Sequence, residues 1–355
     1  MRRFLFPRLA RTLPAAWGIL SVIFLLSRAL SSAPEGLTNI QGASIGGHAA
    51  TPDQIRAAER LLRKRRGLDL PLFYITPAAT ATKQALAWRW HWHGTHNQYH
   101  TWLYSLLHGD LGRSFRDEQS VSMVVLRALA STLPLTCSAF VGIVIVSYWL
   151  TLLLARHRWL RPAVLAGLTV LHALPLFVVA FFLLLLLANP DVLALFPAYG
   201  LNRPESDTSW GEQLISSAYY LVLPLLSLVL VSLPSLVVQV DSALQHELKA
   251  NYSLTARAKG LPERLVIRRH ALRNALLPAI SYVADLLPAL VAGAIVVELI
   301  FAMPGMGRLL AEAAASRDFP VLLGAISVIV LARLLAQIVA DWLQVWANPR
   351  IEAQA

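Results

Sequence analysis

Six long apolar stretches constrain the fold of this chain more than any other feature of its sequence. They run over approximately 9–30, 132–155, 162–188, 216–238, 277–300 and 320–346. A helix needs about 20 apolar residues to cross a bilayer, and each stretch reaches or approaches that length. Only 14% of the residues are charged, whereas soluble domains carry about 25%. We therefore predict an all-α, polytopic membrane protein with six transmembrane helices.

The distribution of basic residues orients these helices. On one side lie the basic N-terminus, residues 156–161, residues 249–273 and Arg350. The short loops of the other side carry only Arg203, Arg308 and Arg317. Because Lys and Arg are enriched in cytoplasmic loops, we predict that both termini are cytoplasmic. The long segment after the first helix is then extracytoplasmic.

This topology divides the chain into four regions. They are the N-terminal end with the first helix (1–30), an extracytoplasmic segment (31–131), a core of five helices (132–346) and a cytoplasmic tail (347–355). A cytoplasmic loop at 239–276 interrupts the core. The first apolar stretch also fits a secretory signal peptide, since arginines precede it and small residues follow it.

Two general features exclude other classes of protein. The formal net charge of +11 would suit nucleic acid, but basic residues interleave with aromatic ones only around 88–100. The topology explains the other basic residues, so we predict no nucleic-acid partner. The single cysteine, Cys137, can form neither an intrachain disulfide nor, by itself, a metal site.

The cytoplasmic loop contains TARAKGLPERLVIRRHALRNALLP, residues 255–278, a basic passage between apolar stretches. The residues from about Asn251 predict a short helix, and Gly260 suits the positive-φ position after its end. Small side chains on this helix would let the backbone of another protein come close. The alternative is a basic loop that only satisfies topology and attracts anionic lipids.

A second, interfacial helix is predicted to begin near Pro262. Its apolar side would carry Leu265, Val266, Leu272 and Leu276. Its basic residues, among them Arg264, would lie elsewhere. This helix leads into the fifth apolar stretch at Pro278.

The loop and several other motifs resemble the permeases of ABC importers, in the dipeptide, oligopeptide and nickel branch. ARAKGL (256–261) and HALRNALLP (270–278) resemble the cytoplasmic coupling loop of that family. Further similar motifs, in the family's order, are TPDQIRAAERLLRKRRGLDLPL (51–72), HGDLGRSF (108–115), ALPLF (173–177), LVLPLLSL (221–228), VVELIFAMPGMGRLL (296–310), RDFPVLLG (317–324) and NPRI (348–351). The resemblance covers most of the chain except about 73–100.

The resemblance implies a set of partners in a bacterial inner membrane. They are a second, related permease subunit, two cytoplasmic ATPase domains and an extracytoplasmic solute-binding protein. The short helix would dock on the ATPase through Tyr252, Thr255, Ala256, Arg257, Ala258, Lys259, Gly260 and Arg264. The sequence contains no G-x-x-x-x-G-K-[ST] phosphate-binding loop, so ATP and Mg²⁺ would be used by the partner ATPase. We predict that this chain itself binds no cofactor.

Two stretches depart from the family pattern. Before the loop, VVQVDSALQHELK has Gln239 and Asp241 where arginines are usual, which leaves open whether an ion pair forms there. In the outer segment, SSAPEGL (31–37) stands where the family has Gly-Asp-Pro. That turn is therefore expected to differ.

The outer segment contains a predicted helix from Thr51 to Arg66. Thr51, Pro52 and Gln54 form a helix start with a capping box. The helix is amphipathic and basic. It would cover the pore mouth or contact the binding protein, unless its charged face is simply solvated.

Residues 88–100, WRWHWHGTHNQYH, are the most unusual part of the outer segment. The tryptophans predict an anchor at the membrane interface or a contact with the binding protein. Imidazole also suits transition metals, which makes His91, His93, His96 and His100 candidate ligands. His91 and His93 would share a strand face, and His96 and His100 would share a helix face.

Ionisable residues within apolar spans are costly and are by default functional. Four lie in or near the predicted spans: His172, Asp285, Glu298 and Arg333. Asp285 and Arg333 would form an interhelical pair or line a pathway. Glu298 belongs to the VVELIF motif, and His172 would bond a backbone carbonyl. No nucleophile–base pair or H-E-x-x-H is present, so no catalytic residue is predicted.

We predict a permease subunit that imports a peptide-like solute with ATP hydrolysed by its partners. A nickel or other metal-complex importer of the same fold is an alternative cargo. An ion-gradient-driven secondary transporter is an alternative mechanism, and it would use Asp285, Glu298 and Arg333. The sequence leaves open the substrate, the pore-lining residues and whether the two permease subunits are identical.

Overall fold

The computed structural model describes residues 2–31, 69–82, 85–198 and 210–347, together with the helical residues 57, 60, 61 and 64. The terminal NPRI motif, most of the turn predicted at 31–37 and most of the helix predicted from Thr51 to Arg66 lie outside the described residues. The chain divides into two compact units. The first comprises 1–13, 125–312 and 327–355, and the second comprises 14–124 and 313–326.

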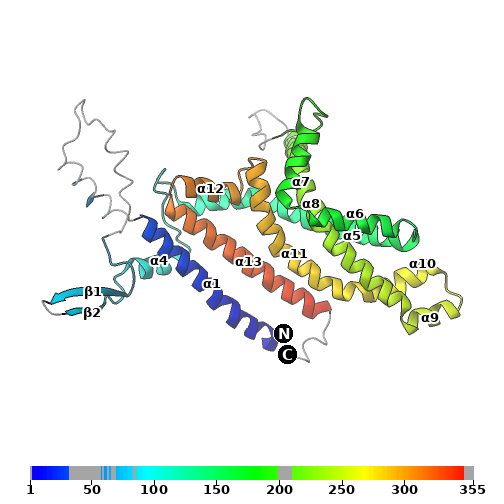
Figure 1. Cartoon of the computed structure of the whole chain (residues 1–355), viewed down its shortest axis with the longest axis horizontal. Helices are drawn as coiled ribbons and strands as arrows, with labels where there is room; N and C mark the ends of the chain where they lie inside the picture. Colours follow the sequence, from blue (N-terminus) through cyan, green and yellow to red (C-terminus); the bar gives the residue numbers. More distant parts are fainter. Residues whose placement is uncertain are drawn as a thin grey trace. The chain divides into compact units, whose positions relative to one another are not determined.

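The helices of the first unit are shown in Figure 1. They are α5 (Val121–Arg156), α6 (Arg161–Ala173), α7 (Leu176–Leu183), η1 (Leu184–Ala188), α8 (Trp210–Lys249), α9 (Asn251–Ala258), α10 (Glu263–Leu265), η2 (Val266–Ala271), α11 (Leu272–Ile300), α12 (Met306–Ala315) and α13 (Phe319–Ala347). The segments η1 and η2 are π-helical. Helices α5, α12 and α13 each continue into the second unit.

Four described helices are long and apolar enough to cross a membrane. They lie within α5, α8, α11 and α13. A fifth span results if α6 and α7 with η1 are counted together. The apolar part of α1, Thr12–Arg28, is shorter than these. The described residues thus form a mostly helical, polytopic membrane protein, and the count of six stays a prediction.

The stretch predicted as one helix over 162–188 is broken in the middle. Helices α6 and α7 meet at an angle of 103° (Figure 1). Leu174 has extended backbone angles (φ −81°, ψ 131°), and Pro175 follows it. A proline disfavours helical backbone in the residue before it, so the ALPLF motif ends one helix and starts another. Hydropathy alone could not reveal this break.

The core of the first unit lies where α8 packs against α6, α7 and α11. Leu223 and Leu228 of α8 and Leu290 of α11 are almost fully buried. Gly293 brings α11 close to α8, because a Cβ atom there would lie 3.0 Å from Leu228 Cδ2. Small residues at such a crossing allow the close packing that holds membrane helices together.

The second unit contains the outer part of α1 (Arg2–Ser31), strands β1 (Ile75–Thr82) and β2 (Ala85–Trp92), and helix α4 (Gln98–Leu107). The strands form an antiparallel hairpin (Figure 1) in which Ile75 pairs with Trp92. The prediction of an all-α fold therefore needs one correction. Threonine and tryptophan favour extended backbone, and β1 contains three threonines while β2 has a tryptophan at every second position from 88 to 92.

Helix α4 begins at a capped end. The side chain of Asn97 accepts a hydrogen bond from the backbone N–H of His100 (2.7 Å), as an N-cap does. The helix then packs on α1, where Tyr99 and Phe24 are both buried. This aromatic contact is the centre of the second unit.

Candidate functional site

The short helix predicted in the cytoplasmic loop is present as α9. It starts after Ala250 and ends at a turn in which Gly260 has φ 79°. The N–H of Leu261 donates to the carbonyl of Ala256 (3.3 Å), which closes the helix end. The helix and its glycine turn are therefore confirmed.

One face of α9 is buried against the rest of the first unit. Ser253 is fully buried, and its hydroxyl donates to the carbonyl of Glu247 in α8 (2.7 Å). Ala256 is 6% exposed and belongs to an apolar cluster with residues of α5, α8, η2 and α11. The small residues of α9 thus let it sit closely on its own chain.

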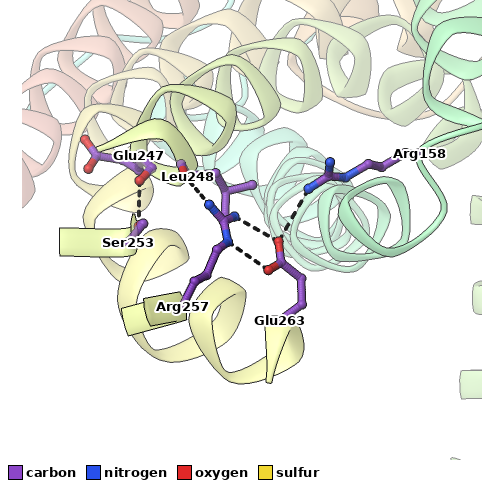
Figure 2. Close-up of polar contacts among 6 residues, drawn as sticks. All are labelled: Arg158, Glu247, Leu248, Ser253, Arg257 and Glu263. Carbon is purple, nitrogen blue, oxygen red and sulfur yellow. Dashed lines mark hydrogen bonds and ion pairs between the residues drawn. The ribbon is translucent and has the colours of Figure 1, made fainter. Parts of the chain in front are cut away.

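An ion-pair clamp, formed by Arg257, Glu263 and Arg158, holds the far end of α9 (Figure 2). Arg257 donates from Nε and Nη2 to the two carboxylate oxygens of Glu263, at 2.9 Å each. Its Nη1 donates to the carbonyl of Leu248 (3.0 Å). Arg158, in the connection between α5 and α6, reaches Glu263 from the other side at 3.4 Å. The clamp therefore joins α8, α9, α10 and the α5–α6 connection.

The clamp changes the acidity of its members. Hydrogen bonds from Arg257, with the charges of Arg257 and Arg158, hold the pKa of Glu263 below its usual range. The same hydrogen bonds raise the pKa of Arg257. Both residues are charged at neutral pH. Glu263 is the one acidic residue in the basic passage 255–278, and this contrast in the sequence already indicates that it forms ion pairs.

The other face of α9 is exposed. Of the eight residues predicted to contact a partner, five point outward as exposed side chains: Tyr252, Thr255, Ala258, Lys259 and Arg264. Ala256 is buried, Arg257 is half-buried in the clamp, and Gly260 forms the turn. Leu254, which was not among the predicted contact residues, is 51% exposed. Its spacing of four from Ala258 places both on one helix face.

The second helix of the loop differs from the prediction in one residue. Val266 and Leu272 are buried as expected, but Leu265 is 40% exposed and Ile267 is buried instead. Residues 266–271 form the π-helical segment η2. A π-helix has a longer period than an α-helix, so it rotates the apolar face away from the expected positions.

The stretch that departs from the family pattern also contains an ion pair. The Asp241 side chain in α8 is only 2% exposed. Arg161, at the start of α6, donates to it from Nε (2.9 and 3.2 Å) and from Nη2 (2.8 Å). This bidentate pair ties α6 to α8 at the start of the loop region 239–276.

Glu298 is locked inside the first unit. It is fully buried and accepts hydrogen bonds from Thr132 Oγ1 and from the N–H of Gly307, at 2.6 Å each. A Cβ atom on Gly305 would lie 2.2 Å from Glu298 Cδ. The VVELIFAMPGMG motif is therefore a turn that folds back onto its own glutamate.

The other ionisable residues of the spans lie apart. Asp285, Arg333 and His172 are exposed in this chain. Within the described residues no ion pair joins Asp285 to Arg333, and no hydrogen bond holds His172. Their roles stay predictions.

In the second unit, two motifs that lie far apart in the sequence meet. Asp318 of RDFPVLLG is buried and accepts hydrogen bonds from the Ser114 hydroxyl and from the N–H of Phe115 (3.1 Å). Both of these donors belong to HGDLGRSF. The two motifs thus form a single structural element.

The four histidines of 88–100 do not converge. His93 bonds Thr76 Oγ1 (2.7 Å), and His100 bonds the hydroxyl of Tyr74 (2.9 Å). His96 precedes α4, so it does not share a helix face with His100 as predicted. In the part of the chain that the structure describes, no group of three or more His, Cys, Asp or Glu is arranged to hold a metal ion.

Residues 119–353 match the model of the binding-protein-dependent transport system inner membrane component family. Because the match spans well over half of the chain, the protein belongs to this family. It is a permease subunit of an ABC transporter and not an enzyme. The family is one of multi-pass inner-membrane proteins that work with an ATPase and a solute-binding protein.

Three relatives illustrate the similarity. The peptidoglycan transport system permease protein YejB of Agrobacterium fabrum is 26% identical, with 99% of this chain and 98% of the relative covered. The probable D,D-dipeptide transport system permease protein DdpB of Escherichia coli is 29% identical, with 82% and 83% covered. The oligopeptide transport system permease protein AppB of Bacillus subtilis is 30% identical, with 72% and 80% covered.

Proposed function

We propose that this chain forms part of the pathway of an ATP-driven importer for a peptide-like solute. An extracytoplasmic binding protein delivers the solute, and a second permease subunit completes the pathway. The names of the relatives, which include dipeptide and oligopeptide permeases, support this cargo. A metal complex is the alternative cargo.

The proposed topology has six spans with both termini in the cytoplasm. The four long helices and the broken pair α6–α7 supply five of them. Helix α1 supplies the sixth. Its apolar part, Thr12–Arg28, would be roughly 25 Å long at 1.5 Å per residue, close to the ~30 Å of a hydrocarbon core.

The observation that carries the proposal is the combination of exposure and bracing in α9. Its outward residues are free to enter a groove on the ATPase. Its inward residues are fixed to α8 through Ser253 and through Arg257, which bonds the Leu248 carbonyl. A push on α9 would therefore reach α8 through these two hydrogen bonds and through the buried face of α9.

The clamp extends this connection to a second element. Through Glu263, the motion of α9 also reaches Arg158 and hence the start of α6. Closure of the two ATPase domains around ATP and Mg²⁺ would bias this rigid assembly between two states, as alternating access requires. The chemistry of ATP stays in the partner subunits.

Site-directed crosslinking tests the proposal. Single cysteines replace Leu254 and Ala258 in a chain whose exposed Cys137 is changed to alanine. Adducts with a co-expressed ATPase subunit should form and should change between ATP and nucleotide-free conditions. A cysteine at the buried Ala256 is the matched control, and it should give no adduct.

One result would overturn the docking of α9. Both exposed cysteines would react with water-soluble reagents from the cytoplasm, yet neither would crosslink to the ATPase in any nucleotide state. Transport in vesicles without ATP would then support the ion-gradient mechanism.

A further inference from the structure

We propose that the β1–β2 hairpin anchors the extracytoplasmic segment to the outer surface of the lipid bilayer through its tryptophan face. The hairpin lies in the part of the chain that the family motifs do not cover. The inference rests on the topology proposed above, which places this segment outside. It does not depend on the cargo or on the docking of α9.

The hairpin has one apolar face. Trp90 and Trp92 are two residues apart in β2, so both side chains project from the same side of the strand. They are 72% and 66% exposed. Ile75 is paired with Trp92 across the hairpin and is 41% exposed, so it adds to this face. Such a large uncovered aromatic surface marks an interaction site.

The opposite face is polar. His91 lies between the two tryptophans in sequence and pairs with Thr76, which places both on the other side. His93 follows the strand on this side, with its ring 4.9 Å from that of His91 and its Nε2 bonded to Thr76 Oγ1 (2.7 Å). The hairpin is therefore amphipathic, as an element lying flat on a membrane surface must be.

The base of the hairpin is held at the level where the membrane ends. Trp92 stacks on Tyr74, and Tyr74 contacts Tyr99 of α4. The Tyr99 hydroxyl is hydrogen-bonded to Ser21 Oγ in α1 (2.6 Å), and its ring packs on Phe24. Ser21 and Phe24 lie within about two helical turns, or roughly 10 Å, of the end of the apolar part of α1.

The position of the hairpin near the end of the apolar part of α1 favours lipid as the partner of the tryptophan face. The polar headgroup regions of a bilayer begin at the end of its hydrocarbon core, and this is where α1 holds the hairpin. Tryptophan is enriched in this layer because its ring is largely apolar but carries an N–H donor. A histidine and threonine face turned toward water completes the match. The solute-binding protein is the competing occupant.

Spin labelling of two adjacent residues distinguishes these occupants. Single cysteines replace Trp90 and His91 in the Cys137→Ala chain, and the full transporter is placed in bilayer nanodiscs without binding protein. The accessibility of each nitroxide to oxygen, which concentrates in lipid, and to a water-soluble nickel chelate is then measured. The ratio of oxygen to nickel accessibility should be several-fold higher at position 90 than at 91.

Two outcomes would overturn the inference. If both labels are equally accessible to nickel, the tryptophan face is in water. If the label at 90 is shielded from both reagents, another protein surface covers it. A second measurement does not depend on cysteine variants: brominated lipids should quench the fluorescence of the wild type more than that of the Trp90→Phe variant.

Discussion

The bidentate pair between Arg161 and Asp241 gives the sharpest test of how this structure is held together. We predict that Arg161→Ala destabilises the folded permease by about 3 kcal/mol, because it leaves a buried carboxylate without its partner. The substitution lies outside the proposed ATPase-binding face. Its first effect should therefore be on stability.

The magnitude follows from the geometry. At the shortest contact of 2.8 Å, the Coulomb attraction is ~6 kcal/mol for an effective dielectric constant of about 20. Part of this attraction only offsets the desolvation of Asp241, whose side chain is 2% exposed. Breaking a buried pair costs about 3–5 kcal/mol. The Arg161 side chain is 36% exposed, so water can partly replace it, and we take the lower end of that range.

The assay is the apparent melting temperature of the detergent-purified permease. It is followed as the fraction that stays monodisperse after heating, because such unfolding is irreversible. A shift of about 2–4 °C per kcal/mol, as found for chains of about 150–250 residues, converts 3 kcal/mol into a decrease of roughly 6–12 °C. Arg158→Ala, which removes a pair exposed on both sides, is the matched control and should change stability by less than about 1 kcal/mol.

The double variant Arg161→Ala/Asp241→Ala decides whether the cause is electrostatic. Removing both charges leaves no unpaired carboxylate, so the double variant should melt well above Arg161→Ala. If the single variant melts like the wild type, the pair contributes nothing. If the double variant is as unstable as the single one, lost packing of the arginine stem is the cause, and the electrostatic account is wrong.

Two further predictions concern other contacts. Gly305→Ala should prevent accumulation of folded protein, because the new Cβ would lie 2.2 Å from Cδ of the buried Glu298. Expression level and monodispersity measure this effect, and a normal yield of monodisperse protein would contradict the prediction. Folding lowers the pKa of Glu263. The clamp therefore stabilises α9 fully at pH values above the pKa that Glu263 has in the unfolded chain, and this stabilisation is lost as the pH falls through the lowered pKa. Amide hydrogen exchange in α9 should therefore rise on acidification below about pH 4, after correction for intrinsic rates, and a Glu263→Gln variant should lack this step.

Local chemistry explains what could be predicted from the sequence. The apolar stretches predict the helices within the membrane, because the bilayer imposes the same length and composition on any spanning helix. The glycine turn of α9 was predictable for a similar reason. A helix end with Gly260 two residues before a proline has few other conformations.

The predictions that were wrong also have local causes. The break at Pro175 was hidden because the flanking residues are uniformly apolar, and hydropathy does not register backbone angles. The exposed Leu265 and the buried Ile267 exchanged places because η2 departs from the 3.6-residue period on which the prediction relied. The histidines looked like a cluster in sequence, yet a hairpin and a helix start direct them to separate partners.

The sequence by itself determined that this chain is a membrane permease and that its basic loop contains a short helix, since both properties depend on residues that are neighbours along the chain. Only the tertiary structure decided how Asp241 is paired, why Ser114 and Asp318 belong to one element, and which face of α9 is free. Each of these depends on contacts between residues that are distant in sequence. A buried polar group takes whichever partner the packing of helices brings within hydrogen-bonding distance, and no local pattern records that choice.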